Sequence, residues 1–140
     1  MISYQQTKDL SVSAQMTFLN MRSYYEQYSV EWDCLKIEEQ IRDLTNLDIM
    51  LNGEIVGAIR LVFDDDSCYI RDLQVSEQHQ GKGIGALAFA ECERLAVEAG
   101  VNRLKLRVFK ISPAFRLYER VGFVVDSADD RFYNMSKKLF

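Results

Sequence analysis

The sequence is poor in several features that define whole classes of protein. It has three cysteines, Cys34, Cys68 and Cys92, whose odd number and wide spacing give neither a zinc site nor a disulfide framework. We therefore expect free thiols in a reducing cytosol, and hence a cytoplasmic protein. Lysine and arginine number 17, against 21 for aspartate and glutamate. The resulting net charge of −4 argues against a general nucleic-acid-binding role, because such proteins usually carry a basic surplus.

Long apolar runs are also missing. No stretch approaches the roughly 20 apolar residues that cross a membrane, and the first residues lack the basic flank and apolar run of a signal peptide. The sequence shows no internal repeat, linker or low-complexity segment. With 140 residues, 48% apolar and 27% charged, the chain is expected to form one globular domain, residues 1–140, without membrane contact.

Short strands and helices alternate along the chain. Ser11 and Ser13 are candidate caps for a first helix, and Asn52-Gly53 between two apolar runs predicts a tight hairpin. Ser112 and Pro113 suit the cap and first residue of a short late helix. Periodicity and turn signals together predict strands at 2–6, 48–51, 54–63, 68–75, 103–108, 123–125 and 132–139, and helices at 14–28, 34–44, 86–99 and 114–121.

The middle of the chain reads as strand, helix, strand. A single crossover of this kind predicts a parallel pair, with residues 70–75 beside residues 103–108. On the second of these strands alternate residues are apolar and basic, which predicts one buried face. The intervening helix is expected to bury a face made of Ile84, Leu87, Ala88, Leu95, Ala96 and Ala99.

A glycine-rich stretch, Gln80 to Gly85, separates this strand from this helix. Glycines at 81, 83 and 85 permit a sharp turn and leave backbone N–H groups uncovered at a helix start, where they can bind an anion such as phosphate. A plain strand-to-helix turn explains the same residues equally well. The Walker pattern GxxxxGK[ST] is absent, and the glycines are too closely spaced for the dinucleotide fingerprint GxGxxG.

Two segments resemble signatures of the GNAT N-acetyltransferase superfamily. The family's acetyl-CoA loop reads Q/R-x-x-G-x-G/A, which Gln80, Gly83 and Gly85 match. Its second signature resembles N-P-A-x-x-L-Y-E-x-x-G-F, and residues 112–123 here read S-P-A-F-R-L-Y-E-R-V-G-F. The two segments lie in the family's order, and the resemblance in element order spans about residues 47–139. Ser112 replaces the family's asparagine, which keeps the helix start but puts in question any contact that needs an amide side chain.

The resemblance implies an α/β fold with a mixed, mostly antiparallel sheet of about six to seven strands, a central parallel pair and about four flanking helices. It implies acetyl-CoA as co-substrate and no metal. Backbone N–H groups of the glycine stretch would hold the CoA pyrophosphate, and backbone groups of the preceding strand would pair with the pantetheine amides. The implied cofactor-binding residues are Leu73, Gln74, Val75, Gln80, Gly81, Lys82, Gly83, Ile84, Gly85 and Ser112. Lys82 either adds charge beside the phosphates or is only solvated.

The resemblance also implies the catalytic groups. Tyr118 matches the tyrosine that protonates the departing CoA thiolate, although a half-buried helix aromatic is the alternative. Asp72 is the candidate base for the amine proton, unless it only pairs with Arg71 or Arg107. His79 receives no proton-transfer role. Four N-terminal aromatic residues either wall an acceptor pocket or belong to the core: Tyr24, Tyr25, Tyr28 and Trp32.

Two hypotheses of function remain at this stage. The first is an acetyl-CoA-dependent N-acetyltransferase that acts on a primary amine by direct attack in a ternary complex, because no Cys/His pair suggests an acyl-enzyme. The second is a non-catalytic acyl-CoA sensor with the same fold. The expected partner is a small-molecule or peptide amine, with neither nucleic acid nor membrane, and the resemblance makes a homodimer plausible.

Overall fold

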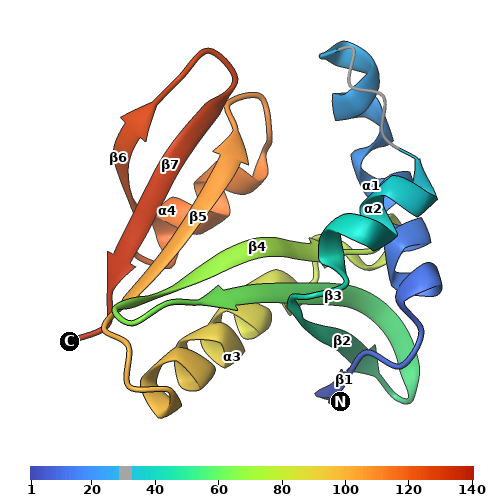
Figure 1. Ribbon diagram of the computed structural model, residues 1–140, viewed down its shortest axis with the longest axis horizontal. Helices are drawn as coiled ribbons and strands as arrows, with labels where there is room; N and C mark the ends of the chain where they lie inside the picture. The colour runs from blue at the N-terminus through green and yellow to red at the C-terminus, as the bar shows by residue number, and fades with distance from the viewer. Residues whose placement is uncertain (29–32) are drawn as a thin grey trace. The chain divides into compact units, whose positions relative to one another are not determined.

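Figure 1 shows the computed structural model, which describes residues 1–28 and 33–140. Their contacts group the chain into two compact units, Met1–Arg60 with Asp72–Ile84, and Leu61–Arg71 with Gly85–Phe140. The expectation of a single domain therefore stays a prediction. The elements are β1 (Ile2–Gln6), α1 (Leu10–Gln27), α2 (Cys34–Ile41), β2 (Thr45–Leu51), β3 (Glu54–Phe63), β4 (Ser67–Val75), a 3-10 turn η1 (Glu77–His79), α3 (Ile84–Glu98), β5 (Arg103–Phe109), α4 (Ala114–Arg120), β6 (Val124–Ala128) and β7 (Phe132–Lys138).

The strands form one mixed sheet in the order β1-β2-β3-β4-β5-β7-β6. β4 and β5 run parallel, whereas β1 with β2, β5 with β7 and β6 with β7 run antiparallel. This confirms the predicted fold class. The predicted parallel pair is confirmed, but its paired part was expected at residues 70–75, whereas the ladder joins Ser67–Ile70 to Arg103–Leu106. The Asp64 carboxylate accepts hydrogen bonds from the N–H and the hydroxyl of Ser67, at 2.7 and 2.8 Å. The turn thus closes early, and the strand pairs from its first residue.

The first unit contains both N-terminal helices. α1 begins at Leu10, because the Asp9 carboxylate accepts hydrogen bonds from the N–H groups of Ser11 and Val12, at 3.0 and 3.3 Å. The prediction of Ser11 and Ser13 as caps is therefore wrong, and Ser13 is buried. A small core joins α1 to α2, with Ala14, Ile37 and Ile41 buried and Leu10, Phe18, Tyr25 and Leu44 packed against them.

The chain turns after α2 earlier than predicted. The amide of Asn46 donates to the carbonyl oxygens of Ile41 and Leu44, at 2.8 and 3.0 Å, which ends the helix at Ile41 rather than Leu44. The hairpin between β2 and β3 is confirmed. Asn52 and Gly53 have φ of +51° and +84°, the left-handed pair that a two-residue turn between twisted strands requires.

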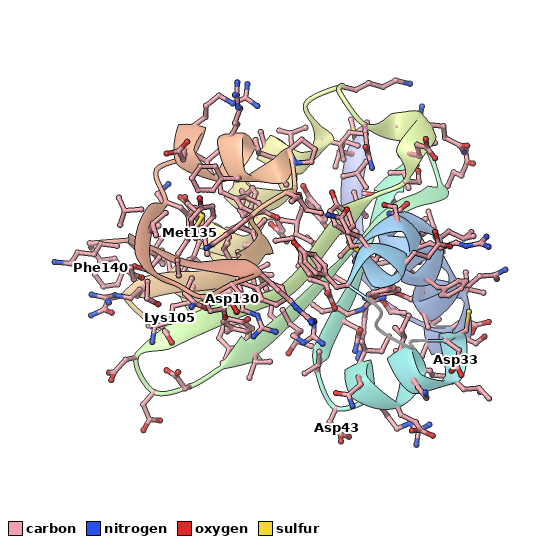
Figure 2. All side chains as sticks on the ribbon, turned by 90° about the horizontal axis from the view of Figure 1, so that it is seen from above. Asp33, Asp43, Lys105, Asp130, Met135 and Phe140 are labelled. Atoms are coloured by element: carbon pink, nitrogen blue, oxygen red, sulfur yellow. The ribbon has the colours of Figure 1, made fainter. Side chains whose placement is uncertain are left out.

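The second unit packs α3 and α4 with β5, β6 and β7. The predicted face of α3 is only partly right, because Leu87 and Ala99 are exposed while Phe89 and Cys92 are buried. Burying the large Phe89 ring removes more apolar surface from water than burying Leu87 would. The alternation on β5 is confirmed, with Leu104, Leu106 and Val108 buried. Figure 2 shows the exposed Lys105 of the same strand at the outer surface.

Candidate active site

The glycines between β4 and α3 serve two physical purposes. Gly81 and Gly83 have φ of +76° and +82°, and a Cβ on either would meet no atom within 4 Å. They are therefore needed for a left-handed backbone that other residues adopt only with strain. Gly85 lies inside α3, and a Cβ there would come within 3.0 Å of Leu117 Cδ2. It allows close packing of Leu117, so its role includes helix contact as well as the predicted bare backbone.

The side chain of Gln80 ties this loop to the end of β4. Its Nε2 donates to the Val75 carbonyl oxygen at 2.9 Å, and Asn20 Nδ2 of α1 donates to the same oxygen at 3.2 Å. Both lone pairs of that carbonyl are therefore used. From the sequence, only backbone contacts were expected for Gln80, and no role was expected for Asn20. The one local feature that points to these side-chain hydrogen bonds is an amide residue five positions after the end of β4.

A missing side chain at Gly57 shapes the same end of β4. A Cβ on Gly57 of β3 would lie 2.3 Å from the Gln74 carbonyl oxygen and 2.9 Å from Ile49 Cδ1. The next contact along the pair is ordinary, with Ser76 N–H donating to the Val56 carbonyl at 2.8 Å. Because position 57 is a glycine, the backbone of Gln74 approaches β3 more closely than a residue with a Cβ at position 57 would permit. A single glycine inside a strand often marks such a close approach of two backbones, but no role was predicted for Gly57 from the sequence.

Asp72 forms an ion pair with Arg60 of β3. Arg60 Nη1 lies 3.1 Å from Asp72 Oδ2, with the arginine side chain fully buried and the aspartate side chain 14% exposed. Arg60 is not one of the two competing partners, Arg71 and Arg107, that were expected from the sequence. Arg107 CZ lies 4.0 Å from the centroid of the Phe132 ring, in the second unit. Strand alternation places residues two apart on one face, but which residue of β3 faces Asp72 depends on the register.

Tyr118 belongs to an aromatic cluster in the second unit. Its ring meets Phe89 of α3 edge to face, with centroids 5.0 Å apart and planes at 83°, and lies 6.2 Å from the Phe123 ring. The side chain is half-buried. This packing fixes the ring direction from two sides, so the position of the hydroxyl is determined by α3 and by the residue after Gly122.

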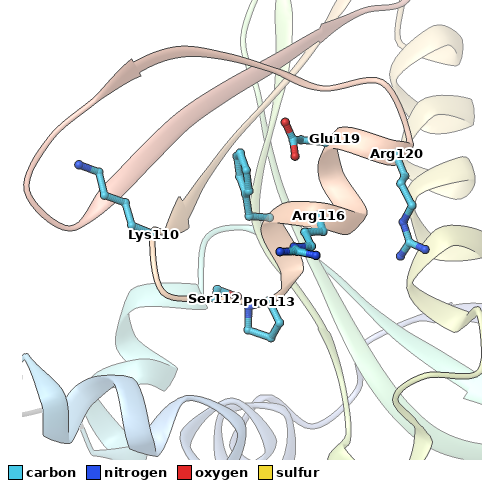
Figure 3. Close-up of a pocket in the computed structure, with 7 residues that line it drawn as sticks. Lys110, Ser112, Pro113, Arg116, Glu119 and Arg120 are labelled. Atoms are coloured by element: carbon cyan, nitrogen blue, oxygen red, sulfur yellow. The ribbon is translucent and has the colours of Figure 1, made fainter.

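Ser112 lies just before α4 and also lines an open pocket. Its Oγ accepts a hydrogen bond from the Ala114 N–H at 3.2 Å. Pro113 occupies the cap position that was predicted for Ser112, and Ala114 is the first helical residue. Figure 3 shows the pocket, about 950 Å³ in volume, lined by Lys110, Ser112, Pro113, Phe115, Arg116, Glu119 and Arg120. Three basic side chains against one acidic side chain favour a negatively charged occupant.

The other candidate residues have local structural partners. His79 Nδ1 lies 2.8 Å from Ser76 Oγ within the turn before Gln80. Tyr25 packs against the small core between α1 and α2, while Tyr24 and Tyr28 are half-buried. Trp32 lies outside the described residues.

The buried cysteines are poorly suited to nucleophilic chemistry. All three cysteines are free, and Cys68 and Cys92 are fully buried. Burial, assisted by the nearby Asp64 carboxylate, raises the pKa of Cys68 to about 12. Burial raises the pKa of Cys92 as well, with the neighbouring Cys68 adding to the effect. Since the thiolate is the reactive form, both side chains are inert near neutral pH.

Within residues 1–28 and 33–140 there is no group of three or more histidine, cysteine, aspartate or glutamate side chains that could hold a metal ion. Among the same residues no helix is both long and apolar enough to cross a bilayer.

The sequence of this chain is similar to those of known acetyltransferases. A family model described as "Acetyltransferase (GNAT) family" matches residues 13–123, which includes the glycine loop and the helix of Tyr118. The chain belongs to the GNAT acetyltransferase family. Streptothricin acetyltransferase of Streptomyces lavendulae is 35% identical over 85 residues, 59% of this chain. That match spans only 45% of the relative's length.

Solved structures of GNAT proteins share the fold. The PaiA N-acetyltransferase of Thermoplasma acidophilum, solved in complex with coenzyme A, aligns over 99% of both chains with a TM-score of 0.80 and 20% identity. A GNAT family acetyltransferase of Elizabethkingia anophelis with acetyl-CoA bound aligns over 98% of this chain and 97% of its own, with a TM-score of 0.73 and 16% identity. The family and fold that the two signatures implied are thus confirmed.

The structure brings the predicted residues together in two sets. Residues 72–84 lie in the first unit, where Arg60, Gly57, Gln80 and Asn20 fix the end of β4. Gly85, Ser112 and Tyr118 lie in the second unit, where α3 and α4 pack together. In each set, these contacts hold the predicted residues in a defined position.

Proposed function

We propose that this protein transfers the acetyl group of acetyl-CoA to a primary amine by direct attack in a ternary complex. One observation carries the proposal: in a GNAT chain, the loop before α3 uses two left-handed glycines to present bare backbone at the helix start. N–H groups at a helix start are unpaired and lie at the positive end of the helix dipole. They suit a pyrophosphate, the anionic part of CoA.

The cofactor contacts are assigned to backbone rather than to side chains. N–H groups from Gln80 to Gly85 hold the pyrophosphate, and the exposed Lys82 adds a positive charge that solvent screens. The pantetheine amides pair with Leu73 and Val75 as an added strand. Because the Val75 carbonyl already accepts two hydrogen bonds, this pairing uses the N–H of Val75 rather than its carbonyl.

The reaction needs one base and one acid. The lone pair of the neutral amine attacks the thioester carbonyl, the C–N bond forms, and the C–S bond breaks with the electron pair leaving on sulfur. Tyr118 gives its phenolic proton to that thiolate, because a thiol is the more stable leaving group near neutral pH. Asp72 takes the proton that the nitrogen loses. The raised pKa values of Cys68 and Cys92 support a direct transfer without an acyl-cysteine intermediate.

Two measurements test the proposal in sequence. Acetyl-CoA at about 100 times its Kd should stabilise the protein by about 2.7 kcal/mol in a thermal-shift assay. Release of CoA thiol is then followed with a panel of amines that includes streptothricin, polyamines, free amino acids and peptides with free N-termini. Thiol release that depends on one of these amines supports the enzyme. Stabilisation by acetyl-CoA without thiol release from any amine would instead support the sensor, and no stabilisation would reject both.

A further inference from the structure

The guanidinium group of Arg60 is fully hydrogen-bonded. The side chain is fully buried in the first unit. Its Nε donates to Asn46 Oδ1 at 3.2 Å, and Nη1 donates to Thr17 Oγ1 at 2.7 Å and to Asp72 Oδ2 at 3.1 Å. Nη2 donates to the carbonyl oxygen and the hydroxyl of Ser13, at 3.1 and 2.6 Å. These five contacts match the five N–H donors of a guanidinium group.

Stability alone does not account for a charge at this position. Removing a guanidinium from water costs several kcal/mol, and a buried ion pair is often no more stable than apolar side chains of similar volume. The neighbours Ile59 and Leu61 on the same strand are buried apolar residues, so β3 is otherwise built as a core strand. What Arg60 adds is geometry, because its planar fork fixes α1, β2 and β4 in one arrangement.

The two side chains of the ion pair differ in their exposure to solvent, and this difference limits what each can do. Arg60 has no exposed side-chain surface and therefore cannot contact a substrate, whereas 14% of the Asp72 side chain reaches solvent. Any effect of Arg60 on chemistry must pass through its partners, which are Asp72, Asn46 of β2 and the α1 segment that contains Ser13 and Thr17. The Asp72 carboxylate is held at Oδ2 by the hydrogen bond from Nη1 and by the charge of the guanidinium.

We propose that Arg60 is a positioning residue that orients the Asp72 carboxylate, with the first turns of α1, to accept the proton that the amine nitrogen loses as it attacks the thioester. This inference rests on the proposed function, and it adds a residue that neither signature contains. The proton passes from the nitrogen to Asp72 and then to solvent, so Arg60 itself neither gains nor loses a proton. A guanidinium suits this task because its planar group donates directed, charge-assisted hydrogen bonds to several partners at once.

A double-mutant cycle tests whether Arg60 acts through Asp72. Arg60→Met removes the charge and fork with a side chain of similar length, and Asp72→Asn removes the base. Each single variant should lower kcat about tenfold or more, towards the range of acid–base effects, while the Kd for acetyl-CoA changes less than about twofold. If Arg60 acts through Asp72, adding Arg60→Met to Asp72→Asn lowers kcat by less than about twofold more. Arg60→Lys, which keeps the charge, should recover part of the loss.

Two further variants keep the test decisive if Arg60→Met folds poorly. Thr17→Val removes one acceptor from Nη1 and leaves the charge, so it should lower kcat while the protein stays folded. Arg94→Met is the matched control, because Arg94 pairs with Glu91 and Glu98 on the exposed face of α3 and should change neither kcat nor Tm appreciably. Unfolding midpoints of all variants are measured so that kcat is compared only well below Tm.

The outcomes separate this inference from the proposed function. Wild-type protein that releases no thiol with any amine overturns the proposed function and this inference with it. Active wild-type protein with additive losses of kcat in the cycle overturns the inference alone, because Arg60 would then act independently of Asp72. Full activity in Asp72→Asn overturns the inference and removes Asp72 as the base, while acetyl transfer itself stands. Active wild-type protein with strongly non-additive losses supports both.

Discussion

Replacement of Gly57 by alanine tests whether the close approach of β3 and β4 sets the cofactor strand. The added Cβ would lie 2.3 Å from the Gln74 carbonyl oxygen, whereas ordinary contact begins at 3.4 Å. The oxygen belongs to the backbone, so it cannot rotate away as a side chain would. The strand must therefore move by about 1 Å at Gln74, the centre of the segment that is proposed to pair with pantetheine.

The expected size of the effect follows from this displacement. Overpacking a rigid core site costs about 1–3 kcal/mol, and a clash with backbone belongs at the upper end. At about 3 °C per kcal/mol for a chain of this size, Tm should fall by about 6–9 °C. A misplacement of about 1 Å at a reacting group can lower turnover by about 10²-fold. Both quantities are measured on one preparation, by thermal unfolding and by thiol release.

Gly53→Ala provides the matched control for this prediction. Gly53 has φ of +84° in the hairpin turn, and a Cβ there would meet no atom within 4 Å. The control should cost about 1 kcal/mol of backbone strain, or about 3 °C in Tm, with unchanged turnover. The reasoning would be refuted by a Gly57→Ala protein with the Tm and turnover of the wild type, or by equal losses of turnover in both variants.

Three further predictions concern the acid, the loop tie and the thiols. Tyr118→Phe should lower kcat by about 10²-fold with little change in acetyl-CoA affinity, and unchanged turnover would remove Tyr118 from the mechanism. Gln80→Ala should weaken acetyl-CoA binding by about 5- to 10-fold, since a hydrogen bond of about 1 kcal/mol holding the loop is lost, whereas an unchanged Kd would mean that the tie does not order the loop. A thiol reagent at neutral pH should modify the half-buried Cys34 alone in the native protein and all three cysteines in denaturant. Because burial raises the pKa of Cys68 and Cys92, the unfolded chain loses those protons first. The contribution of these two thiols to stability should therefore be constant below about pH 8.5 and fall as pH rises towards about 12. Rapid modification of either thiol in the native state would contradict this.

Local signals in the sequence identified most elements of the fold. The left-handed pair at Asn52 and Gly53 and the alternating strand β5 were predictable because their physics involves neighbours along the chain. The cap of α1 was misassigned, since an aspartate at 9 competed with serines at 11 and 13 and only the folded backbone shows which side chain reaches the free N–H groups. The buried face of α3 differs from the predicted face, because periodicity alone does not show that the larger Phe89 ring is buried in preference to Leu87.

The family, the glycine loop and the place of Tyr118 on its helix could be predicted, because each depends on residues close together in the chain. Their surroundings depend on contacts between distant segments, which are known only from the folded chain. The fold pairs Asp72 with Arg60, places Gly57 against the Gln74 carbonyl and sets Gly85 against Leu117. These contacts depend on strand register and helix packing. A shift of one residue in register turns every side chain to the other face of a sheet, so no local pattern can specify them.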